Sequence, residues 1–194
     1  MRKLFLSAAL FSLLSYTLGC NNQVETQQPE VKNLQLGQAP FSISVVPTKS
    51  SEEPFGRRIT MAKEAPRFFY VILSNISKKP QAVFEDWNSW GYQAVSFEIE
   101  TSDGHKFTVS HKLEPFTRNF PSVFLIPPGE HMVYRISFDD RWEATPSIPM
   151  AVQTPIEITI KAIYELRPTP ESVQEKVWAG RVESTVYHFK LTHY

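Results

Sequence analysis

The chain is 194 residues long and 42% apolar, which suits a single domain with a buried core. Its 20 basic and 20 acidic residues cancel, and no stretch gathers the basic residues that binding to a nucleic-acid backbone requires. Fifteen prolines, seven glycines and 13% aromatic residues are typical of a folded, β-rich domain and argue against disorder.

The first 19 residues have the pattern of a secretory signal peptide. Arg2 and Lys3 supply the positive charge, and residues 4–18 form an apolar run interrupted only by Ser, Tyr and Thr. This run is shorter than the roughly 20 apolar residues that a membrane-spanning helix needs. The pattern therefore predicts export of the chain rather than a transmembrane helix.

This segment closes on Thr17-Leu18-Gly19-Cys20, and Cys20 is the only cysteine of the chain. The tetrapeptide resembles the lipobox of bacterial lipoproteins, with Thr17 standing where the family usually has Leu. The resemblance implies that Cys20 is lipidated, becomes the new N-terminus and anchors the protein to a membrane. Asn22 fits the sorting preference of such lipoproteins for the outer membrane, facing the periplasm, over the inner membrane. Ordinary secretion with a chance cysteine is the alternative.

Residues 20–38 (CNNQVETQQPEVKNLQLGQ) are polar and rich in Gln, which predicts a flexible tether between the anchor and a folded domain. Residues 39–194 are expected to form that domain. They contain no cysteine, so the domain has no disulfide and depends on packing for its stability.

Alternating and continuous apolar patterns predict about eight strands in this domain. In chain order, these are residues 41–45, 68–74, 95–100, 106–109, 123–126, 131–138, 156–164 and 181–191, and two weaker candidates are 57–61, as an edge strand, and 82–84. Residues 68–74 (FFYVILS) are apolar on both faces, which predicts a central strand with cover above and below. A helix is the rival interpretation, but the run is short and rich in aromatic and β-branched residues.

Turn and cap residues mark the connections between these strands. Ser102-Asp103-Gly104 between two alternating runs predicts a hairpin, and Thr169 followed by Pro170 predicts the start of a short helix near 169–178, ended by Gly180. The apolar residues of the last strand change face near Ser184, which indicates a bulge. Together the elements predict an all-β domain, an Ig-like antiparallel β-sandwich with one short helix.

Two turn motifs resemble those of Ig-like sandwiches from bacterial envelopes. They are Leu73-Ser74-Asn75-Ile76-Ser77 with Pro80, and Ile126-Pro127-Pro128-Gly129-Glu130 before a strand that contains Tyr134. With the hairpin between them, residues 68–140 resemble the BsuPI-type proteinase-inhibitor domain, which implies an Ig-like fold. Residues 85–92 and the chain after Asp140 depart from that pattern, so the resemblance does not carry inhibition over to this chain.

The sequence lacks the common catalytic and metal-binding motifs. It contains no G-x-S-x-G, H-E-x-x-H, Gly-rich phosphate loop or C-x-x-C. His105 and His111 would lie about 20 Å apart along a strand, too far to share a metal. Asp139-Asp140 with Glu143 could offer oxygens to calcium, but consecutive acids after a strand are more typical of a turn. We expect no metal, no cofactor and no catalytic residue.

Residues 85–92 (EDWNSWGY), called the aromatic segment below, are the candidate binding site. Trp87, Trp90 and Tyr92 lie close in sequence beside Asn88, and Trp and Tyr offer rigid contact area with a polar group attached. Arg118, in the sequence TRNFP, is a further candidate that can reach the same end of the domain. The alternative is that one of the tryptophans only plugs an end of the sandwich.

These observations predict a non-catalytic, lipid-anchored envelope protein whose Ig-like module binds a protein partner. One alternative is binding of glycan or peptidoglycan through Trp87, Trp90 and Tyr92. Another is a periplasmic proteinase inhibitor that uses the long loop at residues 139–154. The expected partners are the membrane, through the lipid on Cys20, and a protein or glycan of the envelope. Both kinds of envelope partner are kept because a sandwich fold alone does not determine the function.

Overall fold

The computed structural model describes residues 39–48, 58–61, 67–147 and 156–193. All of them belong to one unit, Leu36–Tyr194. The expected signal peptide, the lipidation site at Cys20 and the tether lie outside the described residues, as does the second half of the loop at 139–154.

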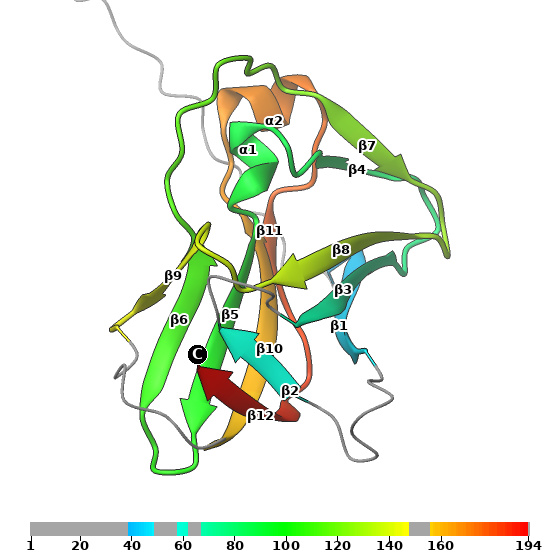
Figure 1. Ribbon diagram of the computed structural model, residues 1–194. Coiled ribbons are helices and arrows are strands. Elements are labelled where there is room, and N and C mark those ends of the chain that lie inside the picture. Colours follow the sequence, from blue (N-terminus) through cyan, green and yellow to red (C-terminus); the bar gives the residue numbers. More distant parts are fainter. Residues whose placement is uncertain (1–38, 49–57, 62–66, 148–155, 194) are drawn as a thin grey trace, which may run out of the picture. The chain divides into compact units, whose positions relative to one another are not determined.

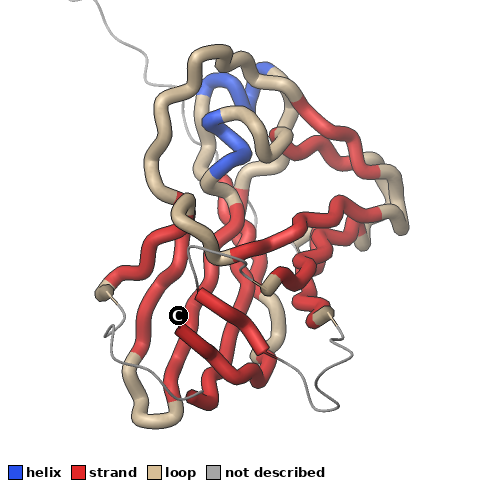
Figure 2. The backbone as a smooth tube through the Cα atoms, viewed as in Figure 1, coloured by secondary structure: helices blue, strands red, loops and turns tan. Residues whose placement is uncertain are grey.

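The described residues form an all-β sandwich with twelve strands and two short helices (Figures 1 and 2). The larger sheet has the order β2 (Arg58–Met61), β12 (Tyr187–His193), β10 (Ile156–Leu166), β5 (Val95–Thr101), β6 (Lys106–His111) and β9 (Trp142–Thr145), with β11 (Gly180–Glu183) also paired to β10. The smaller sheet has the order β1 (Phe41–Pro47), β3 (Phe68–Asn75) and β8 (His131–Ser137). A two-stranded ribbon contains β4 (Gln81–Phe84) and β7 (Val123–Ile126), and the helices are α1 (Ser89–Tyr92) and α2 (Pro170–Gln174).

The predicted fold class is confirmed, and the structure adds elements that the sequence did not indicate. All strand pairs are antiparallel except β2 with β12, which is parallel. Strand β9 lies inside the expected loop at 139–154, and α1 lies inside the aromatic segment. Both elements are only four residues long, too short to produce a recognisable period in the sequence.

Aromatic rings join the two sheets across the core. Phe69 of β3 lies 5.5 Å, between ring centroids, from Phe97 of β5 and 6.1 Å from Phe189 of β12. Phe138, just after β8, is 5.5 Å from Phe69 and 5.2 Å from Phe97. All four rings are buried, and burial of each contributes about 1.5–3 kcal/mol. The inward residues of the alternating strands thus supply the packing on which a domain without disulfides depends.

Strand β3 is central to the smaller sheet, as predicted, but only one of its faces is fully buried. Phe69, Val71 and Leu73 point into the core, whereas the opposite face is half-buried. There Phe68 lies edge-on to Tyr70 at 5.6 Å, and the guanidinium carbon of Arg135 lies 4.3 Å from the Phe68 ring centroid. The expected cover above and below was therefore wrong for this face, where contact with a cation lets an aromatic ring remain partly exposed to water.

The C-terminal elements follow the sequence prediction with one change of length. Thr169 caps α2 through its bond from Ser172 N (3.1 Å), but the helix ends at Gln174, and Gly180 begins β11 instead of ending the helix. The register of β10 shifts by one residue between β11 and β12, which confirms the bulge predicted near Ser184. At this shift the Ser184 hydroxyl accepts a hydrogen bond from Ala162 N at 3.0 Å and so gives that backbone group a partner.

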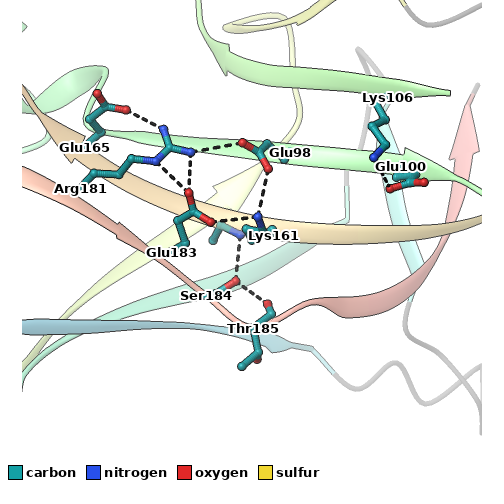
Figure 3. Close-up of polar contacts among 10 residues, drawn as sticks. Glu98, Glu100, Lys106, Lys161, Glu165, Arg181, Glu183, Ser184 and Thr185 are labelled. Carbon is teal, nitrogen blue, oxygen red and sulfur yellow. Dashed lines mark hydrogen bonds and ion pairs between the residues drawn. The ribbon is translucent and has the colours of Figure 1, made fainter. Parts of the chain in front are cut away.

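A network of ion pairs on the exposed face of the larger sheet joins β11 to β10, with which it pairs, and to β5 (Figure 3). Arg181 of β11 contacts Glu165 and Glu183 at 2.7 Å and Glu98 at 3.2 Å, and Lys161 contacts Glu183 at 2.9 Å. Hydrogen bonds from Lys161 and Arg181 lower the pKa of the Glu183 carboxyl. Exposed pairs contribute about 0–1 kcal/mol each, so this network specifies the position of β11 more than it stabilises the fold.

The amide of Asn75, at the end of β3, ties the β4–β7 ribbon to the smaller sheet. Its Nδ2 donates to Ile126 O and to Lys79 O, both at 2.8 Å, and its Oδ1 accepts from Ser77 N at 2.9 Å. The side chain is buried, so removing the amide would delete all three of these hydrogen bonds from a site that solvent does not reach.

We expect Asn75→Ala to lower the free energy of unfolding by about 1–3 kcal/mol, because it removes the three hydrogen bonds of a buried amide. Denaturation in urea, followed by circular dichroism, measures this change. The matched control is Ser74→Ala, whose hydroxyl makes no hydrogen bond among the described residues, and it should stay within about 0.5 kcal/mol of the wild type. Equal effects of the two substitutions would contradict this assignment.

Candidate functional site

Asn88 organises the aromatic segment from inside the protein. Its Oδ1 accepts hydrogen bonds from Trp90 N (3.2 Å) and Gly91 N (3.0 Å), which makes it the N-cap of α1. Its Nδ2 donates to Ser122 O at 2.9 Å. Asn88 is completely buried, so the structure gives this predicted binding residue a positioning role.

A close backbone approach explains the glycine of the segment. A Cβ on Gly91 would lie 2.2 Å from the carbonyl oxygen of Glu85. No side chain can occupy that space without moving the backbone. The aromatic segment therefore folds into a tight turn in which α1 packs against Glu85, the first residue of the segment.

This turn sends the three predicted aromatic side chains into different surroundings. Trp90 is half-buried, with its ring 5.9 Å from Phe84 at a tilt of 35°. Tyr92 is half-buried and stacks on His111, with ring centroids 4.1 Å apart and planes 13° apart. Trp87 is 42% exposed and is the only one of the three that presents a large part of its ring to solvent.

Trp87 is held at the surface by contacts on two sides. Its Nε1 donates to Glu85 Oε2 at 2.6 Å, and the same carboxylate oxygen accepts from the Ser122 hydroxyl. The Trp87 ring meets Phe120 edge to face, with centroids 4.9 Å apart and an angle of 66°. Phe120 is itself 57% exposed. Trp87 and Phe120 thus form a fixed, solvent-exposed aromatic pair.

The loop at residues 112–122 packs on the aromatic segment, as the position of Arg118 suggested. Asn119 makes the contact, because its Oδ1 accepts from Ser89 N (3.0 Å) and its Nδ2 donates to Ser89 Oγ (2.7 Å). Arg118 is exposed and has no hydrogen-bond or ion-pair partner among the described residues. The structure brings the loop that carries Arg118 to Trp87, but it turns Trp90 and Tyr92 elsewhere.

Phe120 is the residue of this surface that sequence reasoning missed. It lies two positions after Arg118 in the same TRNFP stretch, and a large aromatic residue in a predicted loop was the available signal. A single sequence gives no indication of which of Trp87, Trp90 and Tyr92 it contacts.

His111, on which Tyr92 stacks, lies between two aromatic rings. Its ring centroid is 4.1 Å from that of Tyr92 and 3.7 Å from that of Trp142. Burial lowers the pKa of His111, against the opposing effect of its hydrogen bond to the Tyr92 carbonyl (Nδ1 to O, 2.5 Å). Because a carbonyl only accepts, Nδ1 carries the proton of the neutral ring.

The cavity beside this stack is too small for a ligand of ordinary size. Its volume is about 100 Å³, and its lining includes Tyr92, His111, Arg141 and Trp142. Ligand pockets are typically about 300–1,000 Å³. Burial, followed by the nearby Glu114 carboxylate, raises the pKa of Tyr92 to about 12, so its hydroxyl stays protonated at neutral pH. Tyr92 and His111 therefore serve packing in this region.

Asp139, one of the acidic residues considered for calcium, has another partner. Arg141 pairs with Asp139, with Nη2 2.7 Å from Oδ2 and Nε 3.0 Å from Oδ1. Hydrogen bonds from Arg141 outweigh the effect of burial and lower the pKa of Asp139. Within the described ranges, no three His, Cys, Asp or Glu side chains lie together as a possible metal site.

Compared with models of protein families and with curated proteins, the chain matches none of them. Neither helix of the described residues has the length or apolar character to span a bilayer. The candidate site is therefore interpreted from its geometry, which presents the exposed Trp87–Phe120 pair next to the loop that carries Arg118.

The lowered pKa of His111 predicts a pH dependence of stability. The unfolded chain binds a proton near pH 6.5, whereas folded His111 resists protonation, so the free energy of unfolding falls as the pH drops below about 6.5. His111→Phe should flatten this slope, measured by urea denaturation between about pH 5 and 7.5. His105→Phe, which changes an exposed imidazole, should leave the slope as in the wild type, and an unchanged slope in His111→Phe would refute the assignment.

Proposed function

We propose that the protein is a non-catalytic, lipid-anchored module of the bacterial cell envelope that binds another protein through Trp87, Phe120 and Arg118. The observation that carries this proposal is the exposed Trp87–Phe120 pair, which is fixed before any partner arrives. Trp and Arg are enriched among the residues that dominate interface energies. Because contacts on both sides already restrict the Trp87 ring, binding costs little additional side-chain entropy.

The chemistry of the neighbouring polar groups supports a binding role over a catalytic one. Glu85 accepts hydrogen bonds from Trp87 and Ser122, so its carboxylate is engaged in holding the surface. Asn88 and Asn119 bond to the backbone of the opposite segment. Each of these groups positions an element, and none of them faces an enclosed pocket where a substrate could be activated.

The location in the envelope is proposed from the N-terminal sequence. The resemblance of residues 17–20 to a lipobox assigns the anchor to Cys20, and Asn22 favours the outer membrane facing the periplasm. A polar tether at residues 20–38 would give the domain reach from the membrane to an envelope protein.

The geometry favours a protein partner over a glycan. Stacking on successive sugar rings would need several aromatic faces presented together, but Trp87 is the one exposed ring among the three predicted, and Trp90 and Tyr92 are half-buried. Proteinase inhibition would use the loop at 139–154. Its described part is held down at β9, where Thr145 pairs with Thr108, so it offers no support for an inserting loop.

Photo-crosslinking in living cells of the native bacterium tests the partner surface. A benzoyl-phenylalanine at position 120 should give discrete crosslinked products, because Phe120 lies in the proposed contact. The matched control is the same amino acid at position 173, since Val173 on α2 is 74% exposed but lies outside this surface. Trp87→Ala should remove the products from position 120. Equal products from both positions, or products that persist in Trp87→Ala, would overturn the proposal.

The anchor has a separate test. Cys20→Ser should abolish labelling by a fatty-acid analogue and move the protein from the membrane fraction to the soluble fraction, because no other thiol can be lipidated. Thr17→Leu restores the usual lipobox residue and should leave both properties in place. A Cys20→Ser protein that still sediments with membranes would contradict lipid anchoring.

A further inference from the structure

Strand β7 pairs with β4 along only one of its two edges (Figure 1). On an antiparallel strand, the N–H and C=O of successive residues point alternately toward the partner and away from it. Glu85 N donates to Ser122 O (3.1 Å), so Ser122 directs its backbone groups toward the β4 side. Counting on from Ser122, Phe124 also faces β4, whereas Val123 and Leu125 direct their backbone groups to the outer edge.

The far side of β4 agrees with this alternation. Ala82 is the register partner of Leu125, and its carbonyl oxygen accepts from Trp178 N (3.0 Å), on the side away from β7. The backbone groups of Val123 and Leu125 have no partner among the described residues. The outer edge of β7 therefore offers two N–H and two C=O groups in one line, as needed for the addition of another strand.

The side chains beside this edge are apolar and exposed. Phe124 is 42% exposed and Leu125 is 58% exposed, and successive residues of a strand point to opposite faces. A strand added at this edge would therefore meet an apolar side chain on each face. Pro121 and Pro127 bracket β7 and cannot donate to a ladder, so the open edge is limited to these few residues.

The small size of the edge decides what can occupy it. A second copy of β7, paired about a two-fold axis, would bring only four residues from each chain. Such a contact is far below the roughly 1,200 Å² that stable protein interfaces bury. An extended segment of another protein can continue past β7 to the Trp87–Phe120 pair, because Phe120 lies only three residues before Val123. The added contact with these rings favours a partner peptide over a second copy.

We propose that β7 is a docking edge at which an extended segment of the protein partner adds as a strand. Main-chain hydrogen bonds to Val123 and Leu125 hold the segment, and its alternate side chains contact Phe124 and Leu125. This inference rests on the proposed protein-binding function and names the form in which the partner is recognised. The partner chemistry is that of a short β-strand with apolar side chains on both faces, flanked by residues that reach the exposed aromatic pair.

Selection from a phage library of random 12-residue peptides tests this docking edge directly. The full chain is the target, and Leu125→Pro is used to remove peptides that bind elsewhere. Leu125→Pro deletes an outward N–H while leaving the bonds between β7 and β4 intact, so it is tolerated at an edge. A selected synthetic peptide should bind the wild type and lose about tenfold or more in affinity for Leu125→Pro.

Two controls separate the backbone edge from the side chain and from misfolding. Leu125→Ala keeps the N–H and should lose less affinity than Leu125→Pro. The β4–β7 ribbon of Leu125→Pro should remain folded, shown by slow amide exchange of Phe124. In the peptide, N-methylation should abolish binding at one set of alternate residues and be tolerated at the other. Failure to select any peptide, or N-methylation without alternation, would overturn the proposal.

The same variants distinguish this inference from the proposed function. If Leu125→Pro leaves the crosslinks from position 120 unchanged while Trp87→Ala removes them, partner binding stands and strand addition at β7 fails. If the peptide binds with the expected alternation but position 120 gives no crosslinks, the docking edge stands and the aromatic pair is not its extension. A concentration-dependent dimer in light scattering that Leu125→Pro dissolves would replace the partner segment by a second copy.

Discussion

The contact of Phe69 with rings from the facing sheet is the interaction on which the rest of the sandwich depends. Phe69 meets Phe97, Phe138 and Phe189, so one side chain of β3 joins β5, β12 and the chain after β8. These segments are distant in sequence, and no cysteine lies in residues 39–194 to link them covalently. The burial of apolar area is therefore the main term that fixes one sheet on the other. Surface ion pairs, including those around Arg181, help to define where strands lie but contribute little to the free energy of unfolding.

Alternation along single strands predicted the fold because it reflects burial on one face, which is a local property. The strand predicted at residues 131–138 and the bulge predicted near Ser184 are both correct for this reason. The two turn motifs show the limit of local reasoning. They were recognised as separate turns, yet Gly129 N donates to Asn75 O and Asn75 N donates to Glu130 O, so they form one junction. The pairing of two distant motifs depends on the tertiary structure, and a short stretch of sequence carries no information about it.

The candidate site was predicted in part, and the reason lies in the one-turn helix α1. The cluster of aromatic residues correctly drew attention to residues 85–92, and the loop carrying Arg118 does reach them. The rotation of α1 decides which ring is exposed, and that rotation depends on Asn88 and on the approach of Gly91 to Glu85. A helix of four residues has no apolar period from which its inward side could be read. The separation of Trp87 from Trp90 and Tyr92 is therefore a tertiary effect.

The position of β12 between β10 and β2 has a consequence for how the protein reaches its native state. Lys190 is paired with Arg58, and the buried Phe189 and Leu191 complete the core beside β10. Contacts this distant in sequence form late and slowly. A chain synthesised from its N-terminus can form the early hairpins first. The larger sheet, however, lacks β12 until residues near 190 are available. The larger sheet is therefore complete only once the C-terminal strand has paired with both β10 and β2.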